Sequence, residues 1–291
     1  MKKTFLQSLG PGLLFAGAAI GVSHLVQSTK AGAEFGFGLL WALLLVHLFK
    51  YPFFQFGPRY AAATGETLLD GYKKLGKSVL VIYYILNFAT MFTIQAAVTI
   101  VTASLASQLF GFTNDLVLWS VVIMCISFFI LLIGKYKLLD NLMKYIIILL
   151  TISTVIAVNV ALFSTKEGFD FTQIIPSVTV EITFLIAFLG WMPAPLDVSI
   201  WHSIWTVEKD KNTIEKMKPK QALFDFNVGY IGTLFLGVCF VLLGALVMFH
   251  SGQTFSNKGS VFASQLIQLY TKNLGDFSYI FIAAAAFTTM F

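Results

Sequence analysis

The feature that most constrains the fold of this chain is a series of apolar windows of about the length that crosses a lipid bilayer. A helix needs roughly 20 predominantly apolar residues to span the hydrocarbon core. Such windows fall at residues 13–27, 35–56, 79–106, 116–134, 142–163, 178–205, 222–249 and 277–291. Because backbone polar groups must be satisfied inside lipid, the pattern predicts an all-α polytopic membrane protein.

The composition agrees with this class and excludes others. Of 291 residues, 57% are hydrophobic and 11% are charged, whereas about a quarter of a soluble globular chain is charged. The basic residues are dispersed among loops without a basic patch, so we expect no nucleic-acid partner. No nucleophile–base pair, metal-ligand spacing or phosphate loop appears, so the sequence predicts neither an enzyme nor a resident cofactor.

The loops between the windows alternate in basic charge. One alternating set carries fourteen Lys and Arg residues and the other carries four. Cytoplasmic loops of membrane proteins carry the excess of Lys and Arg, so we expect the N-terminus in the cytoplasm. The window at 277–291 is still apolar at its last residue, from which we expect a C-terminally incomplete bundle.

The window at 178–205 contains an interruption. Pro193 and Pro195 lie inside it, and proline lacks the N–H of a helix and clashes with the preceding turn. Backbone carbonyls freed at such a break can bind cations. Asp197 follows two residues later, and an acid at the centre of a membrane helix costs about 3 kcal/mol, so it is by default a functional-site hypothesis.

The first window has a matching irregularity at Gly17 and Gly21, followed by the polar pair Ser23 and His24. Glycine weakens a helix interior. Interrupted helices at corresponding places in two halves are the best sequence pointer to a transporter's binding site. We therefore expect a five-helix repeat at residues 1–163 and the start of a second repeat of inverted topology at 164–291.

Several short runs resemble the Nramp family of divalent metal transporters. They are residues 10–14 (Gly-Pro-Gly-Leu-Leu), residues 30–41, the run Thr-Gly-Glu-Thr-Leu at 64–68, and the pair Met192-Pro193. The resemblance covers the first seventy or so residues and the window at 178–205. It implies the inverted-repeat, broken-helix fold shared with amino-acid transporters (LeuT-like), alternating access, and proton-coupled uptake of manganese or iron.

The chain departs from the family pattern at the positions that hold the ion. Where family members carry Asp-Pro-Gly-Asn in the first helix, this chain has Gly-Val-Ser-His at 21–24, which removes a metal-binding carboxylate and an amide. Met192 is retained, but the histidine that follows Met-Pro in the family is Ala194 here. Asp197 lies in an inserted stretch before His202, and we expect this acid to replace the one lost from the first helix.

The candidate substrate site therefore combines groups from both breaks. The proposed metal ligands are Asp197, Met192 and His24, with Gly21, Ser23 and Pro193 shaping the breaks. Carboxylate, thioether and imidazole together suit a transition metal. Each has an alternative role: Asp197 could cap the second half-helix, His24 could bond a neighbouring helix, and Met192 could serve in packing.

Asp197 and His202 are the candidates for proton coupling. They are five residues apart, which places them about 140° apart around an ideal helix. A shared metal site is therefore not expected, and a proton path along the helix is more natural. The third window carries no acid between Tyr83 and Thr102, although the resemblance implies acids there.

Other polar residues receive structural assignments. The amides Gln95 and Asn227 could contact substrate or simply bond neighbouring helices. His47 and Lys50 are assigned to the interface near the cytoplasmic end of the second window. Glu181 and Asp225 lie near the ends of their windows, where a structural role is expected.

The sequence as a whole predicts a secondary transporter in the plasma or inner membrane. Its expected partners are a divalent metal ion, protons and the lipid bilayer. One alternative keeps the fold and changes the cargo. An amino acid would be held by its carboxylate at Ser23 and the glycines of the first break, and an organic cation would be held by the rings of Trp191 and Trp201. A second alternative is a transporter-derived receptor or scaffold.

Overall fold

All regular elements in the described part of the chain are helices. The computed structural model describes residues 9–164, 168–249, 251, 256, 258–274, 283, 284 and 286–291. Lys2, Lys3, Lys166 and part of the window at 277–291, which entered the charge count and the span prediction, lie outside these residues. The helices are α2 (Pro11–Ala19), η1 (Val22–Ser28), α3 (Thr29–Phe35), α4 (Leu40–Thr64), α5 (Leu68–Leu75), α6 (Lys77–Phe110), α7 (Leu116–Ser164), α8 (Thr179–Trp191), α9 (Val198–Lys211), α10 (Pro219–Leu243), η2 (Gly244–Met248) and α11 (Gly259–Leu274).

Five helical stretches among the described residues are long and apolar enough to cross a membrane. They are Pro11–Phe35, Lys77–Phe110, Leu116–Gly134, Leu138–Phe163 and Pro219–Met248. The helix α4 is not among them, because His47, Lys50 and Arg59 interrupt its apolar sequence. The prediction of an all-α polytopic membrane protein is confirmed.

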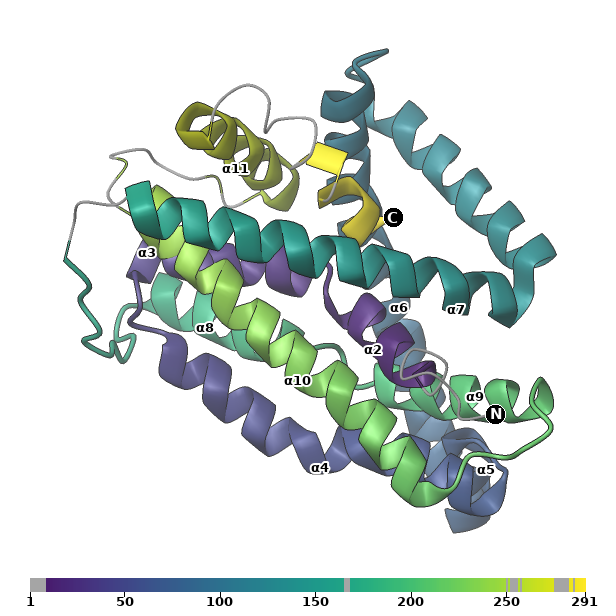
Figure 1. Cartoon of the computed structure of the whole chain (residues 1–291). Coiled ribbons are helices and arrows are strands. Elements are labelled where there is room, and N and C mark those ends of the chain that lie inside the picture. The colour runs from purple at the N-terminus through teal and green to yellow at the C-terminus, as the bar shows by residue number, and fades with distance from the viewer. Residues whose placement is uncertain are drawn as a thin grey trace.

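Two of the predicted windows belong to one continuous helix. The helix α7 runs from Leu116 to Ser164, and its two apolar spans are separated at residues 134–138. Figure 1 shows the darker first part of this helix meeting the part labelled α7 at a sharp corner. The predicted division between the windows at 116–134 and 142–163 therefore falls at that corner.

Two helices lie outside the predicted windows, and the ends of a third differ from the prediction. The helices α5 and α11 lie outside every apolar window because only one face of each is apolar. In α11 the buried residues include Phe262, Leu266 and Ile267. The helix α4 begins at Leu40 and continues to Thr64, beyond the predicted end at residue 56. Its C-terminus is set by Gly65, which adopts a left-handed conformation with φ +73°.

Both predicted breaks are present and lie close to each other. The helix α2 ends at Ala19, and the chain resumes as the π-helix η1 after Gly21. The helix α8 ends at Trp191, and α9 begins only at Val198. Because α2 contacts α9 and η1 contacts α8, the two broken segments lie side by side. The two-repeat division at residue 163 remains a prediction.

The helix α10 lies at the centre of the packing, in contact with α2, α3, α4 and α7 (Figure 1). Two glycines, Gly229 on α10 and Gly244 at the start of η2, allow close contact with the first broken segment. A Cβ on Gly229 would clash with the carbonyl oxygen of Gly12, and a Cβ on Gly244 would clash with that of Thr29. Small residues let membrane helices approach at backbone distance. The first segment is therefore held against α10 on both sides of its break.

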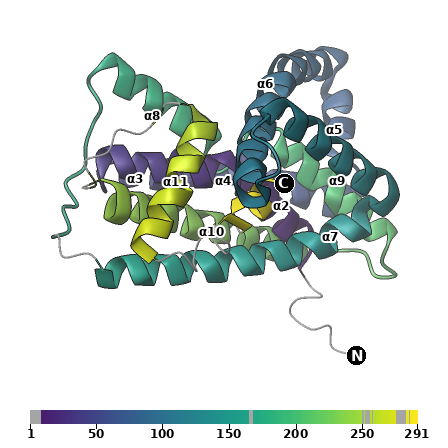
Figure 2. The same ribbon diagram turned by 90° about the horizontal axis from the view of Figure 1, so that it is seen from above.

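The helix α11 packs on the second part of the first broken segment, at η1. It contacts α6, η1 and η2, and in Figure 2 it crosses the purple helix that contains α3. Its buried side chains join the cluster that also holds Val26 and Leu105. The helix closes one side of a large cavity described below.

Candidate functional site

A cavity of about 320 Å³ lies where the two breaks meet. The first break contributes Gly21 and Ser23 to its wall, and the second contributes Asp197. Polar side chains also come from α6 and from the last described residues. The described residues with polar side chains on this wall are Ser23, Gln95, Asp197, Thr288 and Thr289. The breaks thus place hydrogen-bonding groups around a hollow in otherwise apolar surroundings.

Asp197 is the one acidic residue among the described residues that line this cavity. It is half-buried and directly precedes α9, where a carboxylate is favoured by the helix dipole. Its side chain makes no capping hydrogen bond to that helix. The carboxylate lies at the cavity wall, where the backbone N–H groups of Asp197 itself and Val198 stabilise its charge.

Ser23 and His24 face different parts of the molecule. The Ser23 hydroxyl is on the cavity wall and donates to the carbonyl of Ala19. His24 is fully buried and is not among the cavity residues. Its Nε2 lies 2.9 Å from the carbonyl oxygen of Thr233 on α10, and its Nδ1 lies 2.7 Å from the Ser23 hydroxyl. The imidazole thus ties the first break to α10.

Met192 and Pro193 are buried behind the second break. Neither lines the cavity. The Met192 thioether accepts a hydrogen bond from the Ser28 hydroxyl at 3.4 Å and packs against Phe188 and Leu43. The structure therefore brings Gly21, Ser23 and Asp197 together and leaves the other three candidate residues in the surrounding packing.

His202 does not line the cavity that Asp197 lines. Its ring stacks on Phe15 at a centroid distance of 5.6 Å and packs against Phe226. The side chain is fully buried, and neither ring nitrogen has a hydrogen-bond partner among the described residues. A buried imidazole without partners is a costly arrangement that calls for a functional explanation.

Metal ligands of the usual kind do not converge in the described residues. No group of three or more His, Cys, Asp or Glu side chains lies within reach of one ion there. An ion in this cavity would meet one carboxylate together with hydroxyl, amide and backbone oxygens. Such a donor set suits manganese or magnesium better than softer metals.

A second, larger cavity of about 800 Å³ lies on the side of α3 and α11. Lys30 forms an ion pair with Glu34 at 3.5 Å and lies over the ring of Phe184. All three side chains line this cavity. Val22 and Trp191 line both cavities, so these two residues form the boundary between them.

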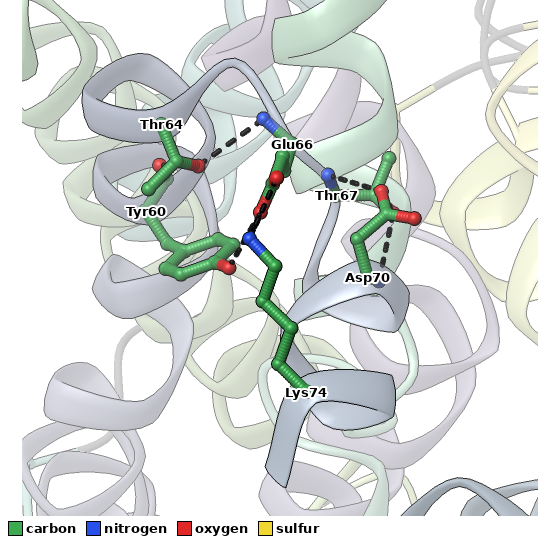
Figure 3. A network of polar contacts seen from close by, with 6 residues as sticks. All are labelled: Tyr60, Thr64, Glu66, Thr67, Asp70 and Lys74. Carbon is green, nitrogen blue, oxygen red and sulfur yellow. Dashed lines mark hydrogen bonds and ion pairs between the residues drawn. The ribbon is translucent and has the colours of Figure 1, made fainter.

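The part of the second broken segment that forms α9 is anchored by residues 65–74, which follow α4. Figure 3 shows Glu66 between Tyr60 and Lys74, whose Nζ lies 2.7 Å from Glu66 Oε1. Thr67 and Asp70 form a reciprocal capping box at the start of α5. Leu68, which follows Thr67 in the chain, donates its N–H to the hydroxyl of Ser203 on α9 at 3.0 Å. The run thus fixes the position of α9.

Lys50, which the sequence assigned to the interface, contacts the second break. It lies near the middle of α4, because α4 continues to Thr64. Its ammonium donates to three backbone carbonyls at the end of α8, those of Leu189, Gly190 and Met192. The sequence signal for this buried contact is that Lys50 is flanked by apolar residues on both sides.

Comparison with known proteins identifies the family. Residues 12–291 match the Nramp family, described as natural resistance-associated macrophage protein-like. The chain belongs to the Nramp family. An uncharacterised protein of Pasteurella multocida is 40% identical over 291 residues, which are 98% of this chain and 66% of that protein. The divalent metal cation transporter MntH of Staphylococcus aureus is 28% identical over 136 residues, covering 46% of this chain and 30% of that one.

Solved structures show the same fold. A mutant of the manganese transporter from Eremococcus coleocola superposes with a TM-score of 0.73 at 17% identity, covering 97% of this Nramp chain and 61% of that one. The same transporter in complex with an aromatic bis-isothiourea compound gives a TM-score of 0.73 at 16% identity, over 98% and 62% of the chains. This chain thus spans about two thirds of the length of its relatives.

These matches confirm the resemblance and the fold class inferred from the sequence. The chain is an all-helical integral membrane protein with the broken-helix, LeuT-like fold of Nramp transporters. The relatives named above by function are transporters. The expectation of a transporter family, and not of an enzyme family, is confirmed.

Proposed function

We propose that this Nramp protein moves a divalent metal cation, manganese or iron, across the membrane by alternating access through the cavity at the two breaks. The names of its relatives, which are metal cation and manganese transporters, support this cargo. In this proposal the substrate is held by Asp197 and the Ser23 hydroxyl, beside the break at Gly21. Thr288, Thr289 and Gln95 offer further oxygen donors on the same wall.

The observation that carries the proposal is the placement of Asp197. A dication that leaves water for a half-buried site needs at least one negative partner, because desolvation would otherwise exceed its attraction to neutral dipoles. Asp197 supplies that charge at the junction of both breaks. The carboxylate that family members carry on the first helix is thereby relocated to the sixth window.

Met192 and His24 hold secondary roles in this proposal. The Met192 thioether becomes a metal ligand only when its 3.4 Å contact with Ser28 opens. His24 keeps the first break in place through its contact with Thr233. Pro193, which cannot donate a backbone N–H, keeps the second break open.

Two features support alternating access and proton coupling. The two cavities lie on opposite sides of Val22 and Trp191. The substrate could therefore occupy first one cavity and then the other as these two residues move. His202 is a buried base whose ring nitrogens lack partners, and it follows Asp197 by five residues on the same half-helix. We assign protons as the coupling ion, with Asp197 and His202 as the carriers.

The test is metal entry into proteoliposomes that contain a metal-sensing dye. Truncating one partner of a buried charge pair typically costs 2 kcal/mol or more, so Asp197→Asn should slow manganese entry about thirtyfold or more. Glu181→Gln is the matched control, since this acid lies at the other end of α8 and lines neither cavity. Unchanged manganese entry in Asp197→Asn would remove the proposed ligand.

An amino acid or an organic cation is the second candidate cargo. Trp191, Trp201 and Trp205 all line the smaller cavity, and aromatic faces attract organic cations. A volume of about 320 Å³ also falls in the range of small-molecule sites. Calorimetry on the purified protein discriminates the two, because saturable heat with an amino acid and none with manganese or iron would favour this alternative.

A further inference from the structure

The side chain of Lys50 reaches across from α4 to the broken end of α8. Its Nζ lies 2.9 Å from the carbonyl oxygen of Leu189, 2.9 Å from that of Gly190 and 2.7 Å from that of Met192. A lysine ammonium has three N–H donors and no acceptor. All three donors are therefore used at this one helix end.

These carbonyls are free because the helix stops. The last helical hydrogen bond of α8 runs from the Met192 N–H to the Phe188 carbonyl at 3.0 Å. The next residue is Pro193, which has no N–H to continue the pattern. The carbonyls of residues 189–192 thus lack helical donors, as the last carbonyls of any helix do. Lys50 satisfies three of these four.

The charge of Lys50 also suits the position. The C-terminal end of a helix carries a partial negative charge and favours a cation. No carboxylate lies within ion-pair distance of Lys50 among the described residues, so carbonyl dipoles are the groups that compensate its charge there. In other broken-helix carriers, half-helix C-termini and unwound carbonyls coordinate a sodium ion or a proton.

We propose that the C-terminal end of α8 is a monovalent cation site that the ammonium group of Lys50 fills as a built-in ligand. An internal side chain thereby takes the place of a bound alkali ion. Lys50 is a positioning residue, which fixes the end of the outer half-helix α8 to α4 next to the second break. The inference does not depend on the identity of the transported substrate.

Chemical rescue tests this site. Lys50→Ala removes the atoms from Cγ to Nζ, and propylammonium has the same atoms. We expect Lys50→Ala to lower the apparent melting temperature of the full chain in detergent by several degrees, because three carbonyls lose their donors. Propylammonium chloride should restore about half of the loss or more, saturably with concentration.

Two controls make the result decisive. Tetramethylammonium chloride carries the same charge but no N–H donor, so it should not rescue Lys50→Ala. Lys77→Ala, which removes an exposed lysine at the start of α6, should gain nothing from propylammonium. Equal rescue by both salts, or equal rescue of both variants, would overturn the proposal.

A second pair of variants covers the case in which Lys50→Ala does not fold. Lys50→Met keeps the length of the side chain without its charge, whereas Lys50→Arg keeps charge and donors. We expect the methionine variant to be less stable than the arginine variant and to yield less folded protein. A methionine variant as stable as the wild type would show that the side chain acts by packing alone, which contradicts the proposed cation site.

Discussion

At the scale of single residues, Asp225 shows how a buried acid can serve the fold. Its Oδ1 accepts the N–H of Gly10 at 2.9 Å, and its Oδ2 accepts the N–H of Gly12 at 2.8 Å. These are free donors at the start of α2, where Pro11 has no N–H to offer. The carboxylate on α10 thus caps the first half-helix, in agreement with the structural role expected for Asp225.

Removing this cap should destabilise the protein. Loss of an N-cap costs about 1 kcal/mol, and buried donors left without partners add about 1–3 kcal/mol. We expect Asp225→Ala to lower the free energy of unfolding by about 2 kcal/mol, measured by thermal or denaturant unfolding in detergent. Asp225→Asn, which keeps one acceptor oxygen, should lose less, and an alanine variant as stable as the wild type would exclude the capping role.

Single residues also mark the limit of sequence reasoning at the site. Asp197 could be singled out because a charge inside an apolar window is visible in the sequence. The partners of His24 and Lys50 could not, since they lie on α10 and α8, far away along the chain. Several polar groups in a membrane helix can be candidates to face a cavity. Which one does so depends on how the helix is rotated about its axis, and a short polar run does not determine that rotation.

At the scale of elements, the sequence predicted the long apolar helices that can cross a membrane. It missed the shorter amphipathic helices. The two breaks followed from local chemistry, from glycines in the first window and from Pro193 in the second. The helices α5 and α11 are amphipathic and lie outside the apolar windows, so a search for membrane spans passes over them. The extension of α4 to Thr64 was missed because Gly57, Pro58 and Arg59 end the apolar run.

The corner between α4 and α5 should respond to acid (Figure 3). Hydrogen bonds from Lys74 and Tyr60 hold the pKa of the Glu66 carboxyl below its usual range, and bonds from Thr67 do the same for the pKa of Asp70. A carboxyl whose pKa is lowered by folding contributes stability above its unfolded pKa, about pH 4. That contribution is lost as the pH falls through the lower folded pKa.

We therefore expect the corner to loosen below about pH 4. Hydrogen exchange at the amides of Thr67 and Asp70, compared between pH 6 and lower values after correction for intrinsic rates, measures this change. The double variant Glu66→Gln and Asp70→Asn should exchange faster at pH 6 and lose the pH dependence. If the wild-type amides were equally protected from exchange at every pH, the ionised carboxylates of Glu66 and Asp70 would not stabilise the corner.

At the scale of the whole molecule, the two broken segments cross the bundle in opposite directions in the proposed inverted repeat. In that predicted division, the segment with α2 and η1 would open a first repeat at 1–163, and the segment with α8 and α9 would open a second at 164–291. Each contributes one wall of the smaller cavity. A site shared between inverted halves lies near the bilayer midplane, where both sides of the membrane are equally distant.

This arrangement requires a definite orientation, which the basic loops predict. Fourteen of the lysines and arginines lie in the sequence stretches between windows that were assigned to the cytoplasm. Residue 212, between α9 and α10, should therefore face inward and residue 170, before α8, outward. After replacing Cys125 and Cys239, a membrane-impermeant maleimide added to intact cells should label Asp170→Cys and spare Asn212→Cys. Asn212→Cys should react only after permeabilisation. The reverse labelling pattern would mean that the chain has the opposite orientation in the membrane. Labelling of both variants in intact cells would place both loops on the same side. That result would contradict a single membrane crossing by the broken segment with α8 and α9.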